Sequence, residues 1–253
     1  MSGKSNTIDI DKSDYKIRLT PSGGRIPNFD EKCLYSVSVG AHGRTIDENV
    51  MGYRWAARTF SSCTVLVGDS LYPSTLQIIE GISEPDAILK AEYQSKLTLN
   101  EFNARIQDLS PPNIIRTRDI IETSEFYNYF ETIAKLYCQN GRFADSVNED
   151  AQWFVMRQAR KSRLRLPMER AINKSIFYIK QEIAVYLFLA ERGYLIDVYL
   201  GREIPTLAKI MTEEIIGGVQ RALADRINIS LERRVSSRKS TSRKELVAAF
   251  ALI

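Results

Sequence analysis

The fold is decided by residues 33–69, which read CLYSVSVGAHGRTIDENVMGYRWAARTFSSCTVLVGD. Residues 33–39 are β-prone and end at a turn that contains Gly40. From residue 45 or 47 to about residue 60, apolar side chains recur near helical spacing, which predicts a helix. Residues 63–69 are a short, almost wholly apolar run of the kind found in parallel sheets that are covered on both faces. A strand, a glycine turn, a helix and a buried strand in this order predict a βαβ unit.

The rest of the chain continues the alternation of helices and strands. The pattern predicts strands over residues 113–116 and 194–200, and helices over 84–107, 122–138, 148–165, 168–192 and 206–226. Residues 1–28 are polar and are predicted to form a flexible N-terminal arm, whereas residues 233–253 form a basic C-terminal tail. Residues 29–232, between them, are predicted to form one α/β domain.

Composition excludes several classes of protein. With 44% hydrophobic and 26% charged residues, the 253-residue chain is neither disordered nor collagen-like. Its longest apolar stretch, residues 183–190, is far shorter than the roughly 20 residues that a membrane span needs. The polar residues 1–12 contain no apolar core of a secretory signal. Three scattered cysteines, at 33, 63 and 138, are too few for a disulfide framework or a zinc site. We therefore expect a soluble, cytoplasmic protein.

Positive charge is concentrated in two clusters, although the net charge is only +4. The tail carries six cations and no acid in residues 233–244. The other cluster comprises Arg157, Arg160, Lys161, Arg163 and Arg165. Such clusters can neutralise phosphates, or they can be a solvated helix face and a disordered tail. Both interpretations are open at this point.

Ser38 is the first candidate for chemistry. Ligands of open α/β sheets bind at the carboxyl ends of the strands, and Ser38 lies at such an end, on the same strand face as Ser36. A serine there is either an exposed nucleophile or a serine that satisfies a turn. The Gly40-x-x-Gly43 spacing is a weak phosphate-binding signal. The single histidine, His42, lies on the same turn, and no G-x-S-x-G segment supports a hydrolase triad.

Two further pairs of polar residues are candidates for the same region. Tyr178 and Glu182 are four residues apart on a predicted helix, so they share a face. A hydroxyl and a carboxylate together can hold an ammonium group or relay a proton, or they can form an ordinary surface pair. Asp197 and Tyr199 are two residues apart on a predicted strand and also share a face. A charge in that apolar strand is costly unless a protein cation or a ligand neutralises it.

Taken together, these segments resemble the tRNA-dependent cyclodipeptide synthases. The resemblance rests on five motifs in the family's order, within residues 33–211. The motifs are Ser36-Val37-Ser38-Val39-Gly40, Trp55-Ala56-Ala57-Arg58-Thr59-Phe60, Val65-Leu66-Val67-Gly68-Asp69, Tyr178-Ile179-Lys180-Gln181-Glu182, and Val198-Tyr199 followed by Ile204-Pro205.

The resemblance implies a Rossmann-like parallel sheet flanked by helices, similar to the catalytic domain of class I aminoacyl-tRNA synthetases. It implies an aminoacyltransferase that takes two aminoacyl-tRNAs and makes a 2,5-diketopiperazine, a secondary metabolite, by a ping-pong route without ATP or a metal. Ser38 is then the nucleophile that accepts the first aminoacyl group. Tyr178 and Glu182 hold its α-amine, and Tyr199 shuttles a proton. We expect a monomer that binds no membrane.

The resemblance also implies a pocket for the first aminoacyl side chain. Carried over to this sequence, its residues are Leu34, Ser36, Gly40, Val65, Val67, Val185, Asp197 and Glu203. A carboxylate such as Asp197 is poorly tolerated there unless a cation meets it, and a guanidinium does so with bidentate geometry. We therefore predict that arginyl-tRNA is one substrate, as in an arginine-using branch of the family. The alternative is that Asp197 pairs with a protein cation such as Arg192 or Arg202.

The tRNA contact is predicted from a departure from the family pattern. Many members grip tRNA with a basic helix after the Asp-ending strand, but residues 84–107 carry only three cations against four acids. The prediction therefore moves the phosphate contact to the cluster at 157–165. Two alternatives stay open: a Rossmann-like enzyme that binds a nucleotide or adenosylmethionine through residues 40–43, and a non-catalytic tRNA-binding relic of the same fold.

Overall fold

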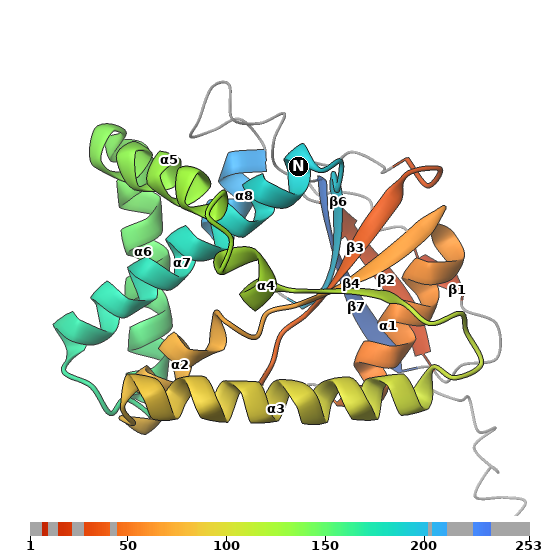
Figure 1. The fold of residues 1–253 in the computed structure, drawn as a ribbon, viewed down its shortest axis with the longest axis horizontal. Helices are drawn as coiled ribbons and strands as arrows, with labels where there is room; N and C mark the ends of the chain where they lie inside the picture. Colours follow the sequence, from red (N-terminus) through yellow and green to blue (C-terminus); the bar gives the residue numbers. More distant parts are fainter. Residues whose placement is uncertain are drawn as a thin grey trace, which may run out of the picture.

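A seven-stranded sheet runs through the part of the chain that the structure describes (Figure 1). The structure is a computed structural model, and it describes residues 7–9, 15–21, 28–40, 45–201, 204–211 and 225–233. The strands β7, β6, β3, β4 and β5 are parallel, whereas β2 pairs antiparallel with β7 and β1 pairs antiparallel with β2. In sheet order the strands are β1 (Thr7–Asp9), β2 (Tyr15–Pro21), β7 (Asp225–Arg233), β6 (Ile196–Leu200), β3 (Lys32–Val37), β4 (Ser62–Val67) and β5 (Asn113–Arg116).

Helices cover both faces of the sheet (Figure 1). Helices α1 and α3 pack on one face with part of α2, and α4 to α8 contribute to the core on the other face. This arrangement confirms the predicted Rossmann-like parallel sheet flanked by helices. The helices are α1 (Ile46–Thr59), α2 (Tyr72–Glu80), α3 (Glu84–Arg105), α4 (Thr117–Ile121), α5 (Phe126–Gln139), α6 (Gly141–Arg160), α7 (Met168–Glu191) and α8 (Pro205–Met211). Within the described residues, none of them combines the length and apolar character that crossing a bilayer requires.

The two cores are separated by the alternation of side chains along the central strands. On β3, Tyr35 and Val37 are buried in the core beside α1 and α3, and Leu34 is buried in the core beside α7. On β4, Val67 belongs to the first core and Leu66 to the second. The period of two therefore decides which side chains of each strand can reach a site on the α7 face.

Helix α1 is fixed at both ends, which holds it behind β3. Thr45 caps its start: the Thr45 hydroxyl accepts from the Glu48 N–H, and the Glu48 carboxylate accepts from the Thr45 N–H. After its last turn, Phe60 is buried and its ring packs against Trp55 and Phe29 at centroid distances of 6.0 and 5.4 Å. The predicted helix from residue 45 or 47 to about 60 is confirmed, and with β3 and β4 it forms the predicted βαβ unit.

The prediction of a flexible arm over residues 1–28 is wrong for the two segments that the structure describes. Strand β2 pairs with β7 from Tyr15↔Arg233 to Pro21↔Ile227, and β1 pairs with β2. The sequence of β2, YKIRLTP, alternates apolar and polar residues as a strand does. It became part of the sheet because β7, at the other end of the chain, supplies its partner. The tail after residue 233 lies outside the described residues.

Several predicted helices have different bounds. The helix predicted over 148–165 begins earlier, at Gly141, and ends at Arg160, because Ser162 has a φ of 54°, a left-handed conformation that a helix cannot contain. The helix predicted over 122–138 begins later, at Phe126, and ends at Gln139 as α5, and the short α4 before it, Thr117–Ile121, was not predicted. The helix predicted over 206–226 is described only to Met211, and the end of that range belongs to β7. The sequence pattern did not predict α2.

Candidate active site

A cavity of about 860 Å³ lies at the carboxyl ends of β3 and β4, bounded by α2, α6 and α7. This edge is where ligands of open α/β sheets bind. Its lining includes Ser36 and Ser38 from β3 and its end, Tyr178 and Glu182 from α7, and Tyr199 from β6. The structure therefore brings together, at one cavity, residues that the sequence places on three separate segments.

Ser38 lies one residue beyond β3 and is half-buried. Its Oγ is 3.2 Å from the hydroxyl of Tyr199, and either atom can be the donor. The contact arises because β3 and β6 are parallel neighbours with Ser36 in register with Tyr199, so both side chains are on the α7 face. A serine hydroxyl bonded to a phenol at a cavity wall is arranged for nucleophilic attack with a proton acceptor or donor beside it.

Asp197 lies behind Ser36 and not in the cavity wall. The Ser36 Oγ donates a hydrogen bond of 2.5 Å to the Asp197 Oδ1 and is 3.4 Å from the hydroxyl of Tyr186. Ser36 and Tyr186 line the cavity, whereas Asp197 is wholly buried and does not line it. The prediction that Asp197 lines the pocket is therefore wrong, because one hydroxyl group separates its carboxylate from the cavity.

Arg192, one of the two cations suggested as a partner of Asp197, pairs with another carboxylate. The Arg192 guanidinium pairs with Glu125, with an N···O distance of 2.5 Å, and also donates to the carbonyl of Phe188. The other predicted partner, Arg202, lies outside the described residues. The hydrogen bond from Ser36 connects Asp197 to the cavity wall.

Two of the predicted pocket valines point to the wrong face. Val65 and Val67 are buried in the core beside α1 and α3. The parallel pairing of β3 with β4 places Ser36 in register with Leu66, so Leu66 has its side chain on the α7 face and lines the cavity instead. The prediction fails because the relative register of neighbouring strands is set by their pairing and not by either strand alone.

The other predicted pocket residues divide into three groups. Gly40 and Val185 line the cavity. Leu34 does not line it, because its side chain is buried in the core beneath, among residues of α7. Glu203 lies outside the described residues, as does the single histidine, His42.

The cavity wall requires a glycine at position 40. It has a φ of 69°, and a Cβ at this position would lie 2.0 Å from the Cζ atom of Tyr72. Tyr72 is buried at the start of α2, and burial, with a smaller contribution from Glu80, raises the pKa of its phenol. The turn after β3 therefore packs directly against the ring of Tyr72, whose phenol hydroxyl keeps its proton.

Tyr178 and Glu182 form a continuous wall with Val185 on one face of α7. All three line the cavity, as residues at i, i+4 and i+7 of a helix do when that face is turned inward. A phenol and a carboxylate are acceptors for an ammonium group. This wall is therefore suited to a ligand that carries a primary amine.

Three of the five cations in the 157–165 cluster line the cavity. They are Arg157, in the last turn of α6, and Lys161 and Arg163, in the segment that follows it. Arg160 and Arg165 do not line it. The Arg165 N–H donates to a backbone carbonyl of α2 at 2.9 Å, which holds this segment against α2. Positive charge is thus gathered at one side of the same cavity.

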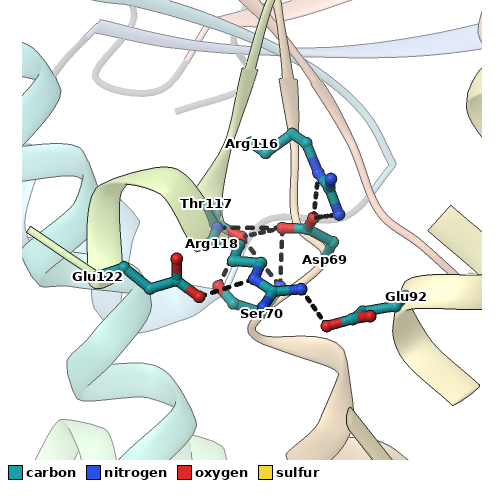
Figure 2. A network of polar contacts seen from close by, with 7 residues as sticks. All are labelled: Asp69, Ser70, Glu92, Arg116, Thr117, Arg118 and Glu122. Carbon is teal, nitrogen blue, oxygen red and sulfur yellow. Dashed lines mark hydrogen bonds and ion pairs between the residues drawn. The ribbon is translucent and has the colours of Figure 1, made fainter. Parts of the chain in front are cut away.

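Asp69 ties the turn after β4 to the end of β5 and the first turn of α4 (Figure 2). It is 3% exposed. Its Oδ2 pairs with the guanidinium of Arg116, with both N···O distances 2.6 Å. Its Oδ1 accepts hydrogen bonds from the N–H of Ser70, the N–H of Arg118 and the hydroxyl of Thr117 at 2.9 to 3.1 Å. One carboxylate therefore joins the turn after β4 to the junction of β5 and α4, at the carboxyl edge of the sheet.

The same network extends to α3. The Arg118 guanidinium pairs with Glu122 and with Glu92 of α3, as Figure 2 shows. Gly68 and Leu71, which flank the Asp69 turn, both line the cavity. The network consequently fixes the wall of the cavity that comes from β4 and α2.

Several cavity residues have no counterpart among the sequence predictions. A signal for some of them exists in helical spacing, since Tyr186 follows Glu182 by four residues and Glu149, Trp153 and Arg157 are four residues apart. Asp150 also lines the cavity and accepts hydrogen bonds from the N–H and hydroxyl of Thr206. In the described part of the chain, His, Cys, Asp and Glu side chains form no group of three that could hold a metal ion.

Comparison with known proteins relates this arrangement to solved structures. No protein-family model matches the sequence, and no curated protein matches it. A cyclodipeptide synthase (CDPS) from Fluoribacter dumoffii matches with a TM-score of 0.71 at 20% sequence identity, covering 85% of this chain and 98% of that one. The chain has the fold of the cyclodipeptide synthases.

Two further CDPS-fold structures extend the comparison. A Mycobacterium tuberculosis protein, described as demonstrating that cyclodipeptide synthetases are related to type I tRNA synthetases, matches with a TM-score of 0.63 at 10% identity, covering 86% of this chain and 93% of that one. A cyclodipeptide synthase from Candidatus Glomeribacter gigasporarum, bound to Phe-tRNAPhe, matches with a TM-score of 0.59 at 16% identity, covering 87% and 94%. At these identities the comparison establishes the shared CDPS fold.

Proposed function

We propose that the protein is an aminoacyl-tRNA-dependent cyclodipeptide synthase that works through an aminoacyl-serine intermediate. The observation that carries the proposal is the pairing of Ser38 with Tyr199 at 3.2 Å, in a cavity also lined by Tyr178 and Glu182. The CDPS fold and the complex of one such enzyme with Phe-tRNAPhe support it.

The first step of the proposed reaction is acyl transfer to Ser38. Its Oγ attacks the ester carbonyl of an aminoacyl-tRNA, the bond to the tRNA 3′-terminal ribose breaks, and the ribose oxygen takes up the serine proton. Tyr199, within hydrogen-bond distance of the serine, is placed to pass that proton. The new ester keeps the activation of the old one, so the step requires neither ATP nor a metal.

The second step forms the dipeptide and closes the ring. The α-amine of a second aminoacyl-tRNA attacks the Ser38 ester, which gives a dipeptidyl-tRNA and frees the serine. The free α-amine of the dipeptide then attacks its own ester to tRNA, which releases the diketopiperazine and the second tRNA. Tyr178 and Glu182 are assigned to the ammonium group of the first aminoacyl residue, which has to be held and then deprotonated.

The tRNA is assigned to the cations on one side of the cavity. Arg157, Lys161 and Arg163 line it and can neutralise phosphates next to the acceptor end. Replacing all three with alanine should reduce the slope of log binding constant against log salt, because each lost phosphate contact removes roughly one unit. An unchanged slope would mean that these three residues form a solvated surface and do not contact the tRNA phosphates.

One substrate is proposed to be arginyl-tRNA. The Ser36 hydroxyl donates its hydrogen bond to the buried carboxylate of Asp197. Its oxygen can therefore act only as an acceptor toward a ligand, and the carboxylate polarises that oxygen. Ser36 and Tyr186 therefore present oxygens to the cavity with a negative charge behind them, which favours a guanidinium. Asp197→Asn keeps the shape and removes the charge. It should lower arginine-containing products about tenfold relative to products of apolar amino acids.

Product analysis of the wild type and of Asp197→Asn and Asp197→Leu tests this assignment. Arginine-containing products that persist at the wild-type level in both variants would contradict it. A wild type that makes only apolar diketopiperazines would do the same.

The central experiment is detection of the aminoacyl-enzyme. The full chain is incubated with aminoacyl-tRNA labelled in the amino acid and analysed by mass spectrometry, and the medium of an expressing culture is analysed for diketopiperazines. Ser38→Ala should carry no label and make no product, whereas Ser36→Ala, a matched change two residues away, should still be labelled on Ser38. Label on Ser36, or full product formation by Ser38→Ala, would refute the mechanism.

A further inference from the structure

An aromatic side chain is exposed on the rim of the cavity, next to the cations. Trp153, on α6, lines the cavity but is 54% exposed. The guanidinium carbon of Arg157, one turn later, lies 4.7 Å from the centroid of the Trp153 ring and 5.6 Å from that of Phe154. Single exposed aromatic rings are common on protein surfaces, and what distinguishes Trp153 is its place at the cavity rim beside a cation.

The surroundings of Trp153 hold the ring in place. Phe154 packs against the small buried cluster formed by Ile78, Val155 and Ala171. Its contact with Arg157 therefore orders the guanidinium, which in turn lies over the Trp153 ring. The indole thus has an ordered partner and does not need a ligand to fix it.

The chemistry of this rim matches an unpaired nucleotide. Aromatic rings and guanidinium planes stack on unpaired bases, and cations beside them neutralise the adjoining phosphates. Lys161 and Arg163 line the same cavity as Trp153 and Arg157. A stacking surface with phosphate-binding groups around it is the combination that proteins use for single-stranded nucleic acid.

We infer that the pair Trp153–Arg157 binds the unpaired base at the 3′ end of the aminoacyl-tRNA. The inference rests on the proposed function, because there the aminoacyl group enters the cavity while it is esterified to the terminal ribose. The base on that ribose then lies at the cavity rim. Trp153 is accordingly a positioning residue that sets the distance between the ester carbonyl and the nucleophile.

The test uses a short RNA hairpin with an unpaired 3′ end that carries 2-aminopurine as its terminal base. Stacking on an aromatic ring changes the fluorescence of this base, so titration with the full chain reports both affinity and stacking. The proteins compared are the wild type, Trp153→Ala, Trp153→Phe and the control Tyr127→Ala. Tyr127 is 64% exposed on α5 and does not line the cavity.

The wild type should quench the fluorescence, and Trp153→Ala should abolish the quenching and bind about 5- to 150-fold more weakly. Trp153→Phe should retain most of both effects, and Tyr127→Ala should match the wild type. A second hairpin that lacks only the terminal base completes a double-mutant cycle, with the affinities of both hairpins measured by filter binding because this one carries no fluorescent base. With that hairpin, the wild type should fall to the affinity of Trp153→Ala, and the substitution should have no further effect.

Two results would overturn the inference, and they are distinct. If the wild type binds hairpins but Trp153→Ala weakens both hairpins equally, the residue acts through the structure of α6 and not through the base. If the wild type binds neither hairpin, the proposed function fails and the inference fails with it.

Discussion

Removal of the Asp69 carboxylate should destabilise the protein more than any change of a surface charge. In Asp69→Ala, the Thr117 hydroxyl, the Arg118 N–H and the Arg116 guanidinium lose the Asp69 acceptor at once, and the Ser70 N–H keeps only the Thr117 hydroxyl oxygen. Breaking a buried ion pair by removing one partner costs about 3–5 kcal/mol. The Arg116 side chain is 26% exposed and can be partly solvated, so we expect a loss near the lower end of that range.

Asp69→Asn separates the hydrogen bonds from the charge. An asparagine oxygen can replace Oδ1 and accept from Ser70, Thr117 and Arg118, but its NH2 group cannot accept from Arg116. We therefore expect a smaller loss for Asn than for Ala, of about 1–2 kcal/mol. The ordering of the two variants is as important as either value.

Urea unfolding measured by circular dichroism provides the free energies of unfolding, with the slope compared between variants to verify that the transition stays two-state. Asp108→Ala is the matched control, because Asp108 also pairs with an arginine, Arg54, but at an exposed position. Its midpoint should hardly change. A loss in Asp69→Ala no larger than in Asp108→Ala would refute the view that the network fixes the cavity wall.

Three other predictions concern single side chains. Gly40→Ala should lower the free energy of unfolding by about 1–3 kcal/mol, because alanine must adopt a left-handed φ there and its Cβ collides with Tyr72. The control is Gly68→Ala, whose Cβ meets only a carbonyl oxygen at 3.7 Å and which should lower the free energy of unfolding by less than about 1 kcal/mol. Tyr199→Phe should slow product formation at least about 10²-fold if its hydroxyl transfers the proton, and a slowing of less than tenfold would leave it only a positioning role. Burial raises the pKa of Tyr53 to about 12, above its ordinary value of 10, so the folded state keeps this proton longer than the unfolded state. The free energy of unfolding should therefore fall as the pH rises from about 10 to about 12, and Tyr53→Phe should lose less of it over that interval in urea titrations.

Local periodicity was sufficient to predict the parallel core and much of the site. The spacing of two on β6 predicts that Asp197 and Tyr199 share a face, and the spacing of four on α7 predicts the same for Tyr178 and Glu182. These are properties of one element at a time. Each of them is determined by the backbone geometry of a strand or a helix, so it can be predicted from the sequence alone.

Relations between elements could not be predicted in the same way. Whether Val65 or Leu66 reaches the cavity depends on how β4 aligns with β3, and a shift of one residue exchanges the two faces. Helical spacing places Trp153 on the same face as Arg157, but its exposure depends on how α6 packs against its neighbours and could not be predicted from that spacing. The burial of Asp197 behind Ser36 likewise depends on the pairing of β6 with β3.

The position of β7 between β2 and β6 has a consequence for how the chain reaches its folded state. The residues that β2 pairs with are more than 200 positions later in the sequence, so this part of the sheet cannot form until residues 227–233 have left the ribosome. Until then β6, whose Ile196, Val198 and Leu200 are buried in the finished structure, is an open strand edge. We expect nascent chains that stop before residue 225 to aggregate through this edge and to need a chaperone, even though every residue that lines the cavity is already present in them.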